Sequence, residues 1–199
     1  MVSSTLSGNE ADNDGGGIFN TGTLTVASGT LSGNSARLRG GGLFNEASLV
    51  VSSSTLFGNS SDTGGAGITN AGGITAELNN TIVGNSSGQS DLVGSFSGSH
   101  NLIEDGFGPG LQDTVTGDPR LSDLSNNGGP TLTHAPLFGS PAIDAGRNDL
   151  VPAAVATDQR GEARIIGPTV DIGAVEAPAH IIVTTSVDED DGTSNPTVG

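Results

Sequence analysis

Acidic side chains and arginines are the residues of this chain that could do chemistry, and one group of them lies between residues 144 and 176. This group consists of Asp144, Asp158, Arg160, Arg164, Asp171 and Glu176. Paired carboxylates in an open cleft can cleave a glycosidic bond. We prefer a second interpretation, in which arginine–carboxylate ion pairs satisfy the buried polar groups of an irregular segment. The sequence therefore predicts no catalytic residue.

A second acidic group has the spacing of oxygen ligands for calcium. Glu10, Asp12 and Asp14 alternate within "EADNDG", as at the start of a calcium loop. Thr21 stands where an EF-hand loop would carry its distal glutamate, and the spacing does not recur further along the chain in the matching segments. A solvated acidic loop is the preferred interpretation, and calcium is kept as the one candidate cofactor.

Composition and charge exclude several classes of partner and site. The formal net charge is −16, and the six basic residues are all arginines, so nucleic acid and anionic lipid are poor partners. The lack of cysteine excludes disulfides and thiolate metal sites. No apolar run is long enough to insert into a membrane. The histidines share no ligand spacing and are expected at the surface or in hydrogen bonds: His100, His134 and His180.

A repeat of about 25 residues determines where these side chains are placed. It is visible in "GGGIFN" (15–20), "GGGLFN" (40–45) and "GAGITN" (65–70), and in "TLSGN" (5–9 and 30–34), "TLFGN" (55–59) and "TIVGN" (81–85). Three short apolar segments per period, separated by Gly, Asn and Ser, indicate strands and turns, and none is long enough for a helix. We therefore predict an all-β chain that folds as a right-handed parallel β-helix, with three short strands in each rung.

Stacking the periods predicts a core made of aliphatic columns. The expected columns are Leu6, Leu31, Leu56 and Ile82; Ile18, Leu43 and Ile68; Leu24, Leu49 and Ile74; and Val26, Val51 and Ala76. Side chains alternate across a strand, so the residues before the first column should point outward. They form an expected exposed ladder of Thr5, Thr30, Thr55 and Thr81. An ice-binding face is the alternative, but the second outward column is not regular enough to favour it.

Two asparagine columns are predicted at the corners of the coil. They are Asn9, Asn34, Asn59 and Asn85, and Asn20, Asn45 and Asn70. Asparagine tolerates the left-handed backbone of a sharp corner, and stacked amides can bond from rung to rung. We therefore assign these residues a structural role.

The repeat divides the chain into three parts. Residues 1–104 are expected to form the rungs, and 105–177 an irregular C-terminal cap, because the last rung of a stacked coil must be covered. Residues 178–199 contain "HIIVTTSV", which is expected to be a linker and the first strand of a following unit. The opening residues already look like part of a repeat and lack the features of a signal peptide, so we expect a longer parent chain.

The cap carries a resemblance to a known family. The run "DPRLSDLSNNGGPTLTHAPLFGSPAIDAG" (118–146), with "TDQRGEARIIGPTVDIGAVE" (157–176), resembles the closing segment of bacterial choice-of-anchor Q domain proteins. The glycine repeats are similar to polymorphic outer-membrane-protein repeats, and "IIVTTSVDEDDG" (181–192) resembles the segment that precedes a CSLREAI motif. The resemblance implies a right-handed parallel β-helix, exported and displayed at the bacterial cell surface, with no known activity.

The expected function is therefore a non-enzymatic structural or adhesive module of an exported surface protein. Its expected partners are other units of the same long chain, and a glycan or a cell-surface protein. The alternative is a polysaccharide lyase or glycoside hydrolase with its carboxylate site in the cap. A carboxylate cluster with raised pKa values in an open groove would favour the enzyme.

Overall fold

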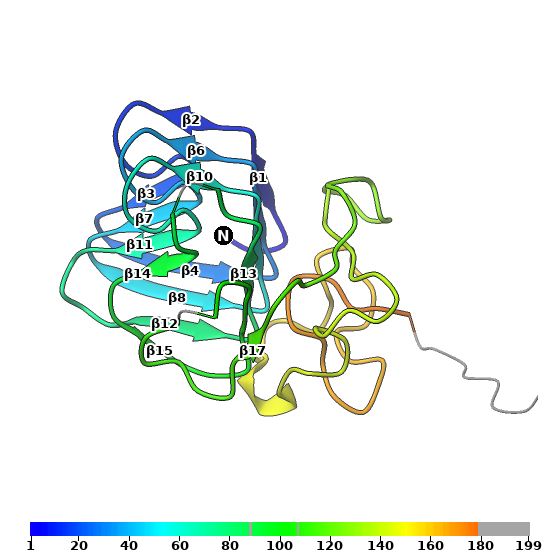
Figure 1. The fold of residues 1–199 in the computed structure, drawn as a ribbon. Helices are drawn as coiled ribbons and strands as arrows, with labels where there is room; N and C mark the ends of the chain where they lie inside the picture. Colours follow the sequence, from blue (N-terminus) through cyan, green and yellow to red (C-terminus); the bar gives the residue numbers. More distant parts are fainter. Residues whose placement is uncertain (88, 107, 179–199) are drawn as a thin grey trace, which may run out of the picture.

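Short strands separated by glycine and asparagine corners stack in parallel to form a solenoid of about four turns (Figure 1). A computed structural model describes residues 1–87, 89–106 and 108–178. Helix is almost absent, and the one short helical segment of the described residues is the 3-10 turn η1 (Asn148–Leu150). The chain is therefore an all-β parallel β-helix, as the repeat predicts.

Each of the first three turns contains the three expected strands and a further two-residue strand at a corner. The first turn has β1 (Thr5–Ser7), β2 (Glu10–Ala11), β3 (Ile18–Asn20) and β4 (Thr23–Ala27). The second has β5 (Thr30–Ser32), β6 (Ser35–Ala36), β7 (Leu43–Asn45) and β8 (Ser48–Ser52). The third has β9 (Thr55–Phe57), β10 (Ser60–Ser61), β11 (Ile68–Asn70) and β12 (Ala76–Asn79). Less regular strands follow: β13 (Ile82–Gly84), β14 (Leu92–Val93), β15 (Phe96–Ser97), β16 (Leu102–Ile103) and β17 (Val115–Thr116).

The strands pair with their copies in the next turn and build four parallel sheets. The first, which we call the cap sheet, has the order β1-β5-β9-β13-β16-β17. The second, the groove sheet, has the order β10-β6-β2, and the other two are β14-β11-β7-β3 and β15-β12-β8-β4. Between the first three turns the partners along the cap sheet are separated by one period of the repeat, as in Thr5↔Thr30 and Thr30↔Thr55.

Glycines before β3 and β7 are required by the close approach of neighbouring turns. A Cβ atom on Gly17 would lie 2.6 Å from the carbonyl oxygen of Gly42, and one on Gly42 would lie 2.6 Å from that of Gly67. No side chain fits at that separation. The repeated glycine hexapeptide is therefore a corner that lets one turn lie directly against the next.

The register changes between the third and fourth turns, and this corrects the predicted columns. Thr55 pairs with Ile82 and Leu56 with Val83, so this step along the chain is longer than the one between the earlier turns. The cause is the longer corner 71–75, which leaves Ile74 as an exposed loop residue. Because side chains alternate across a strand, the slip moves Val83 into the core in place of Ile82. In the fourth sheet the same slip sets Leu78 in the expected place of Ala76, opposite Val51.

The core of the solenoid consists of aliphatic side chains from all the regular turns. Leu31, Leu43, Leu56 and Ile68 are almost completely buried there. A second apolar cluster forms outside the cap sheet, where Ile82 and Leu102 contact Ala142 and Ile172 of the cap. The cap is therefore held partly by an apolar contact of its own.

The cap folds back along the side of the stack and covers the cap sheet (Figure 1). Thr30 and Thr55 of the threonine ladder, which the repeat predicts to be exposed, are consequently buried. Thr5 is half-buried, and Thr81 leaves the ladder because Ile82 pairs with Thr55. The exposed fractions of Thr30 and Thr55 are 0% and 1%. The prediction failed because nothing in the repeat shows that a distant segment returns to this face.

A further strand follows residue 104 in the cap sheet. β17 pairs with β16, and so adds a further strand to the cap sheet. Leu111 packs against the core at this end, where Phe96 donates its N–H to Pro109. Residues 179–199, assigned from sequence to the linker and a following strand, lie outside the described residues.

Candidate functional site

An arginine–aspartate pair holds the centre of the cap. Arg160 donates from Nε to Oδ2 of Asp158 at 2.9 Å and from Nη2 to the carbonyl oxygen of Glu176 at 2.6 Å, and its Nη2 also lies 2.8 Å from Oδ2 of Asp158 in an ion pair. The same carboxylate accepts the N–H groups of Arg160, Glu162 and Glu176. Asp158 is 1% exposed, so its oxygens are occupied by cap groups rather than presented to solvent.

A second buried network surrounds Arg164. Its Nη1 lies 3.3 Å from Oε2 of Glu176, and its Nη2 donates to the carbonyl oxygens of Asp171 and Gly173 at 2.9 and 2.7 Å. The carboxylate of Asp171 accepts the N–H groups of Asp144 and Ala177. The structure therefore brings Arg164, Asp171 and Glu176 together. Arg164 pairs with Glu176, whereas the Asp171 carboxylate is in none of the ion pairs of the described residues.

Asp144 joins this network in a way that differs from the prediction. Its backbone N–H donates to Asp171, and its carbonyl accepts from Thr169 at 2.5 Å. None of the ion pairs within the described ranges includes its carboxylate. Asp144 has a φ of 53°, and this left-handed corner turns the backbone, rather than the side chain, toward the partners.

Burial shifts the ionisation of these groups. It raises the pKa of Glu176 to about 7, with a contribution from the nearby Asp171. Burial likewise raises the pKa of Asp171 and lowers that of Arg164. The exposed fraction of each of these residues is 2% or less. Within the cap, the raised carboxylate pKa values thus belong to a closed network.

The asparagine side chains form two hydrogen-bonded ladders. In the first, Asn9 donates from Nδ2 to Oδ1 of Asn34 at 2.9 Å, and Asn34 donates to Asn59 at 3.0 Å. In the second, Asn20 donates to Asn45 at 2.5 Å, and Asn45 to Asn70 at 2.8 Å. Each amide thus ties one turn to the next.

Asn85 lies outside the first ladder, contrary to the prediction. After the register slip, Gly58 donates its N–H to Gly84, so Asn85 stands level with Gly58 instead of Asn59. Asn85 is exposed, and its N–H donates to the carboxylate of Glu104.

The acidic loop does not assemble into one set of calcium ligands. Asp14 forms a two-point ion pair with Arg39, at 3.0 Å to Nε and 2.8 Å to Nη2. Across residues 1–87, 89–106 and 108–178, no three Asp, Glu or His side chains are grouped as metal ligands would be. Glu10 and Asp12 instead face a groove.

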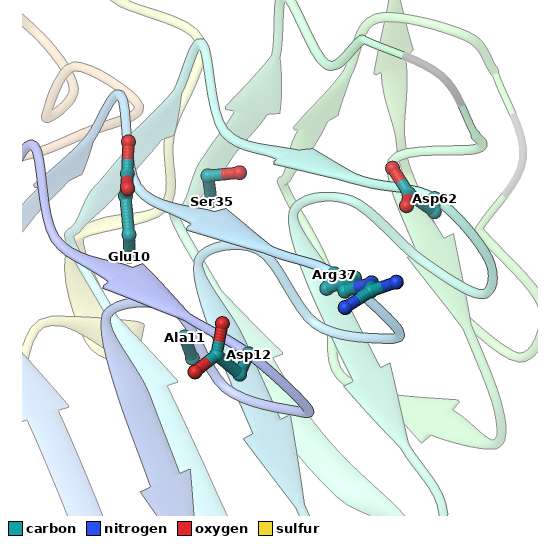
Figure 2. Close-up of a pocket in the computed structure, with 6 residues that line it drawn as sticks. All are labelled: Glu10, Ala11, Asp12, Ser35, Arg37 and Asp62. Atoms are coloured by element: carbon teal, nitrogen blue, oxygen red, sulfur yellow. The ribbon is translucent and has the colours of Figure 1, made fainter.

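This groove, of about 510 Å³, lies on the outer face of the groove sheet (Figure 2). Its lining residues are Glu10, Ala11, Asp12, Ser35, Arg37 and Asp62. They come from three successive turns, because Glu10 pairs with Ser35, and Arg37 donates its N–H to Ala11. Arg37 stands between Asp12 and Asp62 in the stack, and it is in no ion pair of the described part of the chain. Its guanidinium is therefore open to a ligand.

Sequence reasoning missed this groove. From sequence, Glu10 and Asp12 are interpreted as part of a solvated acidic loop, and Arg37 and Asp62 are assigned no role. The regular step between Asp12, Arg37 and Asp62, which equals the period of the repeat, was the signal that could have revealed it.

A smaller acidic pocket of about 220 Å³ follows the groove along the stack. It is lined by Asn85, Ser86, Gln89, Asp91, Glu104 and Asp105. Asp91 and Asp105 exchange N–H-to-carboxylate hydrogen bonds at 3.0 Å, and burial raises the pKa of Asp91. Its residues come from the irregular fourth turn, so the repeat gave no signal for it.

His134 connects the cap to the stack. Its Nε2 lies 2.8 Å from Oγ of Ser32, and its Nδ1 lies 2.7 Å from the carbonyl oxygen of Ser122. The carbonyl can only accept, so Nδ1 carries the proton and Ser32 donates to Nε2. A serine beside an oriented histidine has the geometry of a nucleophile and its base. Ser32 and His134 are both buried beneath the cap, so this contact docks the cap.

Of the other two histidines, His100 alone lies in the described part of the chain. His100 is half-buried, and its Nδ1 lies 3.1 Å from Oγ of Ser99. His180 lies outside the described residues.

Comparison of the chain with models of known protein families and with curated proteins gives no match. Within the described ranges, no helix has the length and apolar character needed to cross a bilayer.

Proposed function

We propose that this chain is a non-enzymatic structural and adhesive module of an exported bacterial surface protein, of the choice-of-anchor Q type. In this proposal the β-helix is a rigid spacer, and it stacks with other units of a longer chain. The groove on the groove sheet is the surface that contacts a glycan or a cell-surface protein. The module works at the outside of the cell.

The observation that carries the proposal is where the polar groups are placed. Asp158, Arg164, Asp171 and Glu176 are buried in the hydrogen-bonded networks of the cap, while Glu10, Asp12, Arg37 and Asp62 line an open groove. Groups that are fixed on a stiff sheet lose little conformational freedom when a ligand binds. The open, rigid and polar surface is thus the one suited to contact.

The direct test is binding by the whole chain to an array of glycans and to a panel of purified extracellular proteins. Arg37→Ala is the informative variant, because Arg37 has no ion pair to lose within the described structure. We expect binding to at least one class of target and at least a tenfold loss in the variant. Arg147→Ala is the matched control, since Arg147 is an exposed arginine of the cap. Absence of binding to both panels would overturn the adhesive role.

The alternative function, a lyase or hydrolase with its site in the cap, has one feature in its favour, the raised pKa of Glu176. A general acid must also reach its substrate. Glu176 and Asp158 are each 1% exposed, so the cap network has no access for a sugar ring. Turnover of a glycan that Asp158→Asn or Asp171→Asn abolishes, with the fold intact by circular dichroism, would establish the enzyme instead.

A further inference from the structure

An aromatic ring is presented to solvent on the outer face of β3. Phe19 is 49% exposed, and its ring stacks on that of Phe44, with centroids 5.2 Å apart and planes inclined by 29°. Phe44 is fully buried and belongs to the same outward column, because the two residues are partners in the β3–β7 pairing. One face of the exposed Phe19 ring is therefore packed against a buried ring of the next turn, which restricts its orientation.

A planar polar pair lies beside this aromatic stack. The guanidinium carbon of Arg39 is 4.5 Å from the centroid of the Phe44 ring. Arg39 bonds both carboxylate oxygens of Asp14 through Nε and Nη2, and no described residue accepts from its Nη1. The Arg39 side chain is 43% exposed. The pair is thus preorganised and still has a donor free.

These two features together are suited to a sugar ring. A pyranose has a face of weakly positive C–H bonds, which suits the negative face of an aromatic ring. Its vicinal hydroxyls lie in a row that a planar, two-point donor or acceptor can match. A small number of polar groups fixed beside an apolar surface is the usual composition of a small-molecule site.

The residues beside this aromatic pair are also close in sequence to the residues of the groove. Asp12 of the groove is two residues from Asp14, and Arg37 of the groove is two residues from Arg39. A chain of several sugars can thus contact the groove and the ring together. The groove itself has more carboxylates than guanidinium groups, and the whole chain has a net charge of −16. Uronates and sulfated sugars are therefore repelled.

We propose that Phe19, with the Arg39–Asp14 pair, forms a subsite for a neutral pyranose ring of a glycan that also contacts the groove. This inference rests on the proposed adhesive function and specifies its ligand class. Phe19 supplies the stacking surface, and Arg39 and Asp14 bond the ring hydroxyls. The glycan is retained without cleavage.

The experiment measures binding of the whole chain to immobilised neutral hexasaccharides (glucose, galactose and mannose series) and to an oligogalacturonate of equal length. Phe19→Ala should lower affinity for the bound neutral glycan at least tenfold. Phe19→Tyr keeps the ring and should stay within about twofold. Val93→Ala is the matched control, because Val93 is an exposed apolar residue of the same outer face and should leave binding unchanged. Melting temperatures show whether each variant is folded.

The outcomes separate this inference from the function on which it rests. Binding that Arg37→Ala weakens but Phe19→Ala does not would overturn the subsite and leave the adhesive module in place. Binding to proteins alone, or preferential binding to oligogalacturonate, would overturn the neutral-glycan subsite and also spare the adhesive role. Absence of binding to glycans and proteins alike would overturn both.

Discussion

Replacing Glu176 by glutamine should change how the stability of the protein depends on pH. Glu176 is buried in the Arg164 network, and its pKa is raised from 4.5 to about 7. The folded state therefore holds the proton more tightly than the unfolded state does. Glutamine does not titrate, so its own contribution does not change with pH. Its NH2 group cannot accept one of the N–H bonds that Ile166 and Asp171 donate to the two carboxylate oxygens, and this costs the variant a constant amount at every pH.

The direction and size of this pH effect follow from the linkage between proton binding and folding. Below pH 4.5 Glu176 is protonated in both states, and its contribution to stability is fully present. As the pH rises from 4.5 to about 7, the unfolded state ionises first, and that contribution is lost. At about 1.4 kcal/mol per pKa unit the loss reaches at most about 3 kcal/mol. Glu176→Gln should gain up to that amount over the parent between pH 5 and pH 8.

Urea unfolding followed by circular dichroism, at half-unit steps from pH 5 to pH 8.5, measures the difference between parent and variant. Titrating groups far from Glu176 are common to both proteins and cancel in this difference. Asp171 is coupled to Glu176, so its ionisation is part of the measured change. A carbon-13 NMR titration of the Glu176 carboxyl gives the pKa directly. If the variant instead loses stability relative to the parent as the pH rises, the ion pair with Arg164 outweighs burial, and the reasoning is refuted.

Two further predictions concern the solenoid. Leu31→Asp places a charge in the core and should lower the free energy of unfolding by about 4 kcal/mol. Ser7→Asp changes an exposed site and should lower it by less than about 0.5 kcal/mol. Equal losses of stability in urea melts would contradict the assignment of Leu31 to the inward face. Asn34→Ala removes a buried ladder amide and should cost about 1–3 kcal/mol, because the Oδ1 of Asn34 accepts from the turn before it and its Nδ2 donates to the next. Asn9→Ala, at the exposed end of the same ladder, should cost clearly less, and the reverse order would show that the ladder does not stabilise the stack.

The cap is better described as a cover for one face than as a plug for one end. Thr30 bonds Gln159 at 2.6 Å, Thr55 accepts from Ala174 at 3.0 Å, and Ser32 bonds His134 at 2.8 Å. Hydroxyls on an outward strand face thus act as docking points for backbone and side chains of the cap. This burial removes the flat threonine array that an ice-binding function would need.

The sequence by itself determined the repeat, the all-β class and the corner residues. In a parallel stack each residue lies against its own copy in the next turn, so a period in the sequence is also a period in space. For this reason the sequence alone predicts that Leu31 and Leu56 lie in the core and that Asn34 and Asn59 belong to one ladder. The close approach at Gly42 follows from the same rule.

Only the tertiary structure decided what breaks the period. The longer corner before β12 moved Ile82 out of the core and Asn85 out of its ladder, because one step along a strand reverses the face of every side chain. The return of the cap to the cap sheet joins residues such as Ser32 and His134, which are far apart in the sequence. No local pattern encodes such a contact, since it depends on how two separately formed surfaces fit. The groove at Asp12, Arg37 and Asp62, by contrast, follows the period of the repeat, and the stack places its three turns side by side.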